Sequence, residues 1–164
     1  MLALLDLLQS VGAAVWVDGG WGVDALIGHQ SRPHADLDLS VDTPSLAAVR
    51  SVLADEGFVV LRDDLPTALA LWHPDGREVD LHPVVPTDDG GGDQALPDGG
   101  WWHYPPPATG RIDGREVICL SVETQVRAHA SYEPDDGDRA DMALLADAFG
   151  VELPQQLRTR PPTL

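Results

Sequence analysis

Apolar and polar residues recur along this chain with two periods, which predict a series of short helices and strands. Apolar residues recur at helical spacing from Leu2 to Val11 and predict a first helix, which Gly12 ends. An apolar strand over 14–17 and a short helix over 21–27 come next. The same criteria predict a helix begun by Thr43-Pro44 and closed by Gly57, strands over 58–61, 67–72, 78–84 and 117–120, and helices over 121–131 and 138–149. This order predicts an α+β fold, a mixed β-sheet flanked by helices with a small C-terminal helical part, rather than a regular βαβ series.

Residues 86–115 form the least regular stretch, because Gly, Pro and Asp are dense there. We expect a mobile loop in this region. It contains Trp101 and Trp102, which either line a ligand site from an exposed loop or pack within a hairpin; both interpretations stay open. The 164 residues suffice for a single compact domain overall, with a core over 1–120 and a helical part over 121–164.

Two carboxylates stand one residue apart in a predicted strand. Strict alternation over 36–41 places Asp36 and Asp38 on one face of that strand and the leucines on the other. Two like charges side by side repel, so a cation between them is the natural reason to keep both. Mg²⁺ is the expected ion, because it favours carboxylate oxygens.

A third carboxylate shows the same alternation, in the segment from Glu78 to His82. Asp80 and His82 share one face of this later strand. If the two strands are neighbours, the three aspartates converge and can hold two Mg²⁺ ions about 3.5–4 Å apart, the spacing used for in-line nucleotidyl transfer. His82 is then a candidate substrate contact, with a hydrogen-bonded structural histidine as the alternative.

A glycine pair precedes the carboxylate strand. At Gly19-Gly20 we expect a turn in which the backbone approaches a ligand closely, and amides at the following helix N-terminus suit anionic phosphates. Arg32 and His34, just upstream of the carboxylates, are expected to reach the same triphosphate and to offset charge as pyrophosphate leaves. Each motif alone is weak, whereas their combination at this spacing is specific.

The excess of acidic residues limits the kinds of molecule that the protein is expected to bind. With 10 basic and 27 acidic residues, the net charge is −17, which disfavours nucleic acid partners and suits cationic or metal-bridged substrates. No apolar run approaches membrane-spanning length, and the apolar N-terminus lacks a positive region and is interrupted by Asp6. The single cysteine, Cys119, excludes an intrachain disulfide and suits a reducing compartment. We therefore expect a cytoplasmic protein without a membrane or nucleic acid partner.

These motifs resemble the nucleotidyltransferase superfamily related to DNA polymerase β, in its minimal antibiotic-modifying branch. The likeness is strongest to the small lincosamide nucleotidyltransferases, with the aminoglycoside 2''-adenylyltransferases next. The segments that carry it are Trp16 to Asp24, Arg32-x-His34-x-Asp36-Leu37-Asp38, Val79 to Pro83, Pro97 to Gly100, and Glu123-x-Gln125-x-x-x-His129-x-x-Tyr132. They follow in order over nearly the whole chain.

The resemblance implies Mg²⁺ and ATP, with transfer of AMP to a hydroxyl of a small-molecule antibiotic. By position, Asp36 and Asp38 become metal ligands, and Asp80 is either the third ligand or the general base. From the C-terminal helices, three residues would face the acceptor or the nucleotide: Glu123, His129 and Tyr132. The resemblance also implies a homodimer with the site near the interface.

The sequence leaves two antibiotic classes possible as the acceptor of AMP. The segment Trp101 to Tyr104 is bulkier and more aromatic than the lincosamide enzymes lead us to expect, and Pro105 to Pro107 has no counterpart in the resemblance. The acidity suits a polycationic aminoglycoside slightly better, whereas the motifs favour a lincosamide, which carries one amine.

Three rival interpretations compete with this assignment. Gly20-x-Gly22-x-x-Ala25 matches a dinucleotide-binding fingerprint, but its acidic residue should end the second strand, whereas Asp36 begins one. A degenerate nucleotidyltransferase serving as a binding or antitoxin-like protein is disfavoured, because all three carboxylates are present. Nucleotide addition to RNA is disfavoured by the charge, while addition to a protein side chain stays open.

Overall fold

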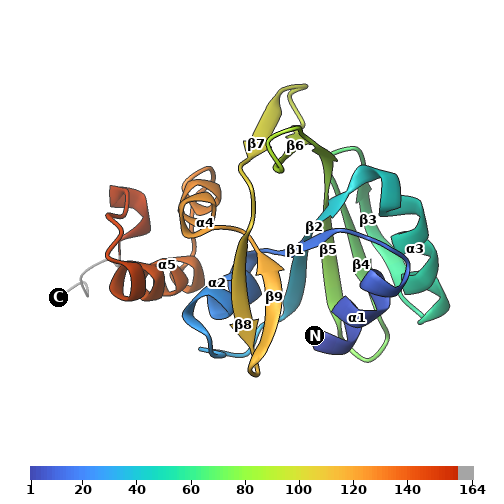
Figure 1. Cartoon of the computed structure of the whole chain (residues 1–164), viewed down its shortest axis with the longest axis horizontal. Coiled ribbons are helices and arrows are strands. Elements are labelled where there is room, and N and C mark those ends of the chain that lie inside the picture. The colour runs from blue at the N-terminus through green and yellow to red at the C-terminus, as the bar shows by residue number, and fades with distance from the viewer. Residues whose placement is uncertain (159–164) are drawn as a thin grey trace.

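A computed structural model describes residues 1–158 of the chain; the end of the predicted helical part, 159–164, lies outside the described residues. Helices and strands alternate along the first part, and two further helices follow the last strand (Figure 1). The helices are α1 (Leu2–Ser10), α2 (Gly19–Ile27), α3 (Leu46–Asp55), α4 (Val122–His129) and α5 (Asp136–Phe149), with short 3₁₀ turns at Thr43–Ser45 and Gln155–Leu157. The strands are β1 (Val15–Val17), β2 (Asp36–Asp42), β3 (Val59–Asp64), β4 (Ala68–Trp72), β5 (Glu78–Pro86), β6 (Gly92–Ala95), β7 (Trp101–Tyr104), β8 (Ala108–Ile112) and β9 (Arg115–Cys119).

The strands form one mixed sheet, as the sequence predicts. Its order is β3-β4-β5-β2-β1-β9-β8, and the β6–β7 hairpin continues from the end of β5. The β2–β5 and β1–β9 pairs are parallel, while the other pairs are antiparallel. The two strands expected to carry carboxylates are therefore neighbours in the middle of the sheet.

One face of the sheet carries the main core. The leucines of β2 and the apolar residues of β4 and β5 pack there against α1 and α3, which lie together at the right of Figure 1. Leu39, Val79 and Leu81 have no exposed surface, and burying a side chain of this size stabilises a fold by about 1.5–3 kcal/mol. Because successive residues point to opposite faces, this burial forces the intervening aspartates to the other face.

The C-terminal helices dock on the helix that follows the glycine pair. Val23 of α2 joins Met142 and Leu145 of α5 in a second apolar cluster, completed by Leu153 and Leu157. Helix α5 begins with a capping box in which Asp135 and Asp138 bond each other's backbone amides, and it ends at Gly150. This packing holds α4 and α5 beside the start of α2.

The prediction of a mobile loop over 86–115 is wrong. The region forms β6, β7 and β8, and the aromatic residues Trp102 and Tyr104 pack with Val84 and Leu120 in a third small core. The turn residues that suggested a loop serve tight hairpin connections, while each short strand still buries at least one side chain: Gln94 in β6, Tyr104 in β7 and Ile112 in β8. The alternative, a packed hairpin, is confirmed.

The start of the third helix also differs from prediction. Asp42 is the N-cap of a 3₁₀ turn that precedes the helix, and its carboxylate accepts bonds from the amide and hydroxyl of Ser45. Ser45, rather than Thr43, is the N-cap of α3. A 3₁₀ turn over Thr43–Ser45 then leads into α3. Among residues 1–158, no helix is both long and apolar enough to span a bilayer.

Candidate active site

The three predicted aspartates lie on one face of the sheet. In the parallel β2–β5 pair, Asp38 is directly opposite Asp80, and Asp36 is opposite Glu78. Paired residues of adjacent strands point to the same side, so Asp36, Asp38 and Asp80 all face away from the main core. The predicted proximity of the two strands is thereby confirmed.

The negative charge of the aspartates on this face is only partly neutralised by nearby basic side chains. Burial, together with the charge of Asp38, raises the pKa of both Asp36 and Asp80. Asp80 Oδ1 is buried without a hydrogen-bond partner, and its other oxygen is 4.0 Å from Arg62 Nη2. A carboxylate oxygen in this state favours a cation or a proton donor beside it.

His82 is held between the carboxylates and the hairpin. Its Nε2 is 3.6 Å from Asp38 Oδ1, and Gln94 Nε2 is 3.3 Å from its Nδ1. Gln94 is oriented by Tyr104, whose hydroxyl donates to Gln94 Oε1 over 2.6 Å. Burial disfavours the imidazolium, but Asp38, with Asp18 and Asp80, outweighs it and raises the pKa of His82. His82 thus has fixed partners on both ring nitrogens while it still lines a pocket with Asp38.

The glycine pair lies inside the first turn of α2 rather than in a turn before it. Asp18 caps the helix, and its carboxylate accepts a 2.6 Å bond from the Gly19 amide. Gly19 has a φ of +55°, and a side chain there would collide with the Asp38 carboxylate. A side chain at Gly20 would collide with the His34 ring and the Arg32 guanidinium. Glycine is therefore required here because three functional side chains press against the backbone.

Arg32 is fixed by the C-terminal helix. Its Nε and Nη2 donate to the two carboxylate oxygens of Asp141 on α5, over 2.9 and 2.6 Å. This bidentate geometry sets the guanidinium plane. Arg32 then lines a pocket together with Gly19, Gly20 and Asp38.

His34 takes a different place from the one predicted. Its side chain is only 2% exposed, and its Nε2 is 2.5 Å from Asp24 Oδ2. Asp24 is held in turn by the amide and hydroxyl of Ser31. The ring packs on Trp21, behind Gly20. Since its side chain presents almost no surface, His34 packs behind the first turn of α2.

Two pockets that share part of their lining open beside Asp38. The larger, of about 420 Å³, lies between the start of α2, strand β2 and the two C-terminal helices. We name it the nucleotide pocket after the ligand that the sequence predicts for its residues. The smaller, of about 270 Å³, reaches toward His82 and Gln94. Both are lined by Gly19, Asp38, His129 and Tyr132.

Two of the three residues predicted from the last helices, His129 and Tyr132, line pockets that also include Asp38. His129 Nδ1 donates to the Gln125 carbonyl over 2.8 Å, which turns Nε2 toward Asp138 at 3.7 Å. The Tyr132 hydroxyl donates to the same Asp138 oxygen over 3.1 Å. Both side chains are thus anchored to α5 and present one edge to the pockets.

Three predicted substrate contacts lie apart from these pockets. Glu123 is exposed in the first turn of α4 and lines neither pocket. Trp102 is half-buried under the guanidinium of Arg127, whose central carbon is 4.8 Å from the ring centre. Trp101 is 62% exposed and lines a separate cavity beside the β6–β7 hairpin. The structure does not bring these residues to the carboxylates.

Sequence inspection missed the residues that orient the site. Asp24 and Asp141 hold His34 and Arg32, and Gln94 and Tyr104 hold His82. Asp141 is 109 positions from Arg32, so no local pattern pairs them. Alternation around Gln94 and Tyr104 could have revealed the hairpin, had the turn residues not dominated the interpretation.

Comparison with known proteins supports one family. The sequence profile described as aminoglycoside-2''-adenylyltransferase matches residues 1–145. A curated lincosamide resistance protein from Staphylococcus haemolyticus is 33% identical over 141 residues, covering 85% of this chain and 88% of that protein.

Solved structures agree with this result. The crystal structure of the lincosamide antibiotic adenylyltransferase LnuA with bound lincomycin superposes with a TM-score of 0.81 at 31% identity, covering 90% of this chain and 94% of that one. The complex of ANT(2'')-Ia with adenylyl-2''-tobramycin gives a TM-score of 0.70 at 20% identity, covering 90% and 86%, and so supports the shared fold alone.

Proposed function

The chain belongs to the aminoglycoside-2''-adenylyltransferase family of antibiotic nucleotidyltransferases, and on that premise we propose that it moves AMP from ATP to a hydroxyl of a small-molecule antibiotic, releasing pyrophosphate. The observation that carries the proposal is the direct pairing of Asp38 with Asp80 beside the Gly19–Gly20 turn. Strands β2 and β5 thus offer a rigid pair of carboxylates next to a pocket that fits a nucleotide.

The carboxylates fit Mg²⁺ when phosphate oxygens complete its coordination. Within residues 1–158, no three His, Cys, Asp or Glu side chains are arranged to hold a metal ion by themselves. Mg²⁺ in nucleotide enzymes is usually held by one or two carboxylates plus phosphates and water, so a closed cage is not required. Asp36, Asp38 and Asp80 would hold it, and the unpartnered Asp80 Oδ1 supports this fit. Bound Mg²⁺ would neutralise phosphate charge and lower the pKa of the attacking hydroxyl.

The nucleotide pocket provides the remaining contacts for the triphosphate. The Arg32 guanidinium, fixed by Asp141, would bind phosphate oxygens and offset the charge of departing pyrophosphate. Backbone amides at the start of α2 add a partial positive charge to the same region. Tyr132, half exposed at the pocket edge, would contact the nucleoside.

We assign Asp80 to the acceptor side, because His82, two residues further along β5, shares its face of the strand and lines the smaller pocket. Its raised pKa and its unpartnered oxygen suit either a third metal ligand or the base that accepts the proton of the attacking hydroxyl. His82, fixed between Asp38 and Gln94, would position the acceptor hydroxyl in front of these carboxylates.

A homodimer is part of the proposal. Strand β3 is an edge of the sheet, and its consecutive residues Val59, Val60 and Leu61 are all exposed. An exposed apolar edge strand is a natural surface for pairing with a second copy. Sedimentation velocity should give twice the monomer mass, and a monomer at micromolar concentration would contradict this part.

A mass-spectrometric screen tests the activity. The protein is incubated with ATP, Mg²⁺ and, separately, lincosamides and aminoglycosides. We expect one antibiotic class to gain the mass of one AMP with release of pyrophosphate, and Asp38→Asn to form no adduct. ATP binding without an adduct on any hydroxyl acceptor would instead support a degenerate binding protein.

A further inference from the structure

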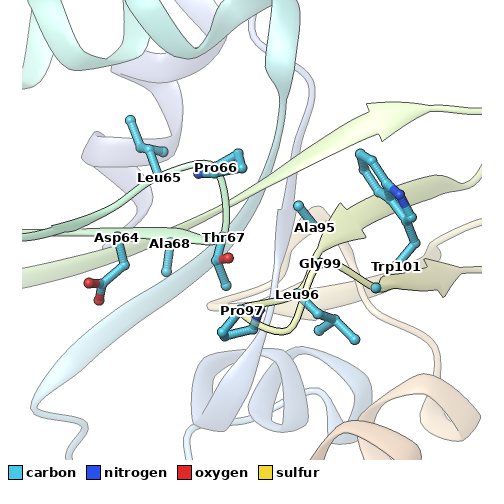
Figure 2. A pocket seen from close by; sticks show the side chains of 11 residues that line it. Asp64, Leu65, Pro66, Thr67, Ala68, Ala95, Leu96, Pro97, Gly99 and Trp101 are labelled. Carbon is cyan, nitrogen blue, oxygen red and sulfur yellow. The ribbon is translucent and has the colours of Figure 1, made fainter.

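A further pocket, separate from the two that include Asp38, lies beside the carboxylate site. Its volume is about 770 Å³, within the usual range for small-molecule sites. One wall is the turn from Asp64 to Ala68, and the other is the hairpin segment from Ala95 to Trp101; Figure 2 shows them at left and right. We call this cavity the side pocket.

The side pocket opens on the same face of the sheet as the aspartates. Ala70 is paired with Asp80 across β4 and β5, and Asp64 is paired with Ala68 across β3 and β4. Paired residues point the same way, and residues two apart on a strand share a face, so Asp64 and Ala68 project on the carboxylate side. Ala68 is the diagonal neighbour of Asp80, a position typically about 7–8 Å away.

A shared amide separates the two sites. Gln94 Nε2 donates to the Thr67 carbonyl over 2.9 Å and also lies 3.3 Å from His82 Nδ1. Thr67 lines the side pocket, whereas Gln94 and His82 line the smaller pocket in front of Asp38. A ligand in the side pocket therefore lies next to the reacting groups, across one side-chain amide.

The lining of the side pocket is apolar and close to neutral. Its apolar members are Leu65, Pro66, Leu96, Pro97 and Trp101. Its single charged lining residue is Asp64, whose Oδ2 is 2.8 Å from Arg62 Nε. The nucleotide pocket, by contrast, is lined by five aspartates. A polycation would gain little in the side pocket, while an apolar group would lose water-exposed surface there.

Building on the nucleotidyl transfer proposed above, we propose that the side pocket holds the apolar portion of the hydroxyl acceptor. It thereby selects amphipathic acceptors with at most one cationic amine over polycationic ones. The acceptor hydroxyl would extend past Gln94 and His82 toward Asp80, where AMP transfer takes place. Lincosamides have this chemistry and aminoglycosides do not.

Calorimetric titration without ATP tests the proposal, with lincomycin and tobramycin as probes. Lincomycin should bind the wild-type protein more tightly than tobramycin. Trp101→Ala removes an exposed wall, and Ala68→Leu fills the floor; each should weaken lincomycin binding roughly tenfold or more. Trp72→Ala and Thr109→Leu make the same kinds of change at exposed strand positions outside the side pocket, and should leave lincomycin binding within about twofold.

The KM for ATP distinguishes a local loss of acceptor binding from general damage to the protein. The KM for ATP should stay unchanged in Trp101→Ala, because the nucleotide pocket does not include this residue. Unchanged lincomycin binding in both pocket variants would overturn the proposal, as would tighter binding of tobramycin. Loss of a dimer in Trp101→Ala at unchanged acceptor affinity would also overturn it, since the cavity would then be an interface.

The two proposals fail in different ways. If AMP transfer to tobramycin is found without binding of lincomycin, the side pocket assignment is wrong and nucleotidyl transfer stands. If lincomycin binds in the side pocket but receives no AMP, the pocket assignment stands and the proposed reaction is wrong.

Discussion

The site combines two regions that are held in place in different ways: the carboxylate strands β2 and β5, and the surrounding group of β6–β7, α4 and α5, which we call the cover. In the strands, each aspartate is oriented by the alternation of its own strand over a buried apolar face. In the cover, single polar contacts between distant segments orient the functional groups, such as Asp141 with Arg32 and Tyr104 with Gln94. Substitution of an aspartate in the strands should therefore abolish the reaction itself. Substitution of an orienting residue in the cover should instead misplace the substrates.

The largest effect is expected at the strands. Asp38→Asn should lower kcat roughly a thousandfold or more, because it removes a charge that the phosphates and their cation require. The fold should persist, since the side-chain volume is unchanged and Asp38 is partly exposed. Steady-state rates with thermal unfolding curves provide the measurement, and Asp55→Asn, exposed at the end of α3, is the control. Near-normal turnover in Asp38→Asn would show that the carboxylate strands do not carry out the reaction.

A smaller effect is expected when Arg32 loses its contact with the cover. Asp141→Asn weakens the bidentate contact with Arg32, and charge-assisted bonds of this kind contribute about 1.5–3 kcal/mol. We expect the KM for ATP to rise roughly tenfold, with a smaller change in kcat. Asp147→Asn, exposed on the same helix, controls for the loss of a charge from α5. Equal behaviour of the two variants would mean that Arg32 needs no support from the cover.

A stability effect should report the Tyr104–Gln94 contact. Tyr104→Phe removes a hydroxyl that is buried and bonded to Gln94 Oε1 over 2.6 Å. Leaving that acceptor unsatisfied should cost about 1–3 kcal/mol in the free energy of unfolding. Urea denaturation measures the loss. Because Gln94 also orients His82, the KM for the acceptor should rise more than the KM for ATP; parallel changes in both would contradict this link.

The smallest effect concerns pH and the exposed hairpin. His103 lies between Asp93 at 2.7 Å and Asp89 at 3.1 Å, and these carboxylates raise its pKa. A raised histidine pKa stabilises the folded hairpin fully below the ordinary histidine pKa of about 6.5, and this contribution is lost as pH rises through the raised value. An NMR titration of His103 should show the raised pKa, and Asp93→Asn should lower it. No change in Asp93→Asn would show that the contact does not form in solution.

The contrast between the two regions also explains what the sequence could predict. The carboxylate strands were predictable, because period-two alternation fixes which residues share a face and the buried leucines fix which face that is. Adjacency of β2 and β5 was expected from the chemistry and is confirmed by their register. Helices α4 and α5 were predictable from their caps at Ser121 and Gly150.

The cover was less predictable, because its contacts join residues far apart in the chain. His34 was expected to reach the triphosphate, but Asp24, ten residues earlier, draws its ring behind the turn. Glycines and prolines over 86–115 concealed short strands whose pairing depends on the end of β5. The partner of Arg32 becomes visible only once α5 is packed on α2.

The central claim is that the paired carboxylates and the nucleotide pocket act together on a nucleotide. Isothermal titration of ATP with and without Mg²⁺, on the wild-type protein and on Asp38→Asn, tests it most directly. We expect ATP binding that depends strongly on Mg²⁺ in the wild type and loses that dependence in the variant. Equal ATP affinity of both proteins, with the same response to Mg²⁺, would contradict the account.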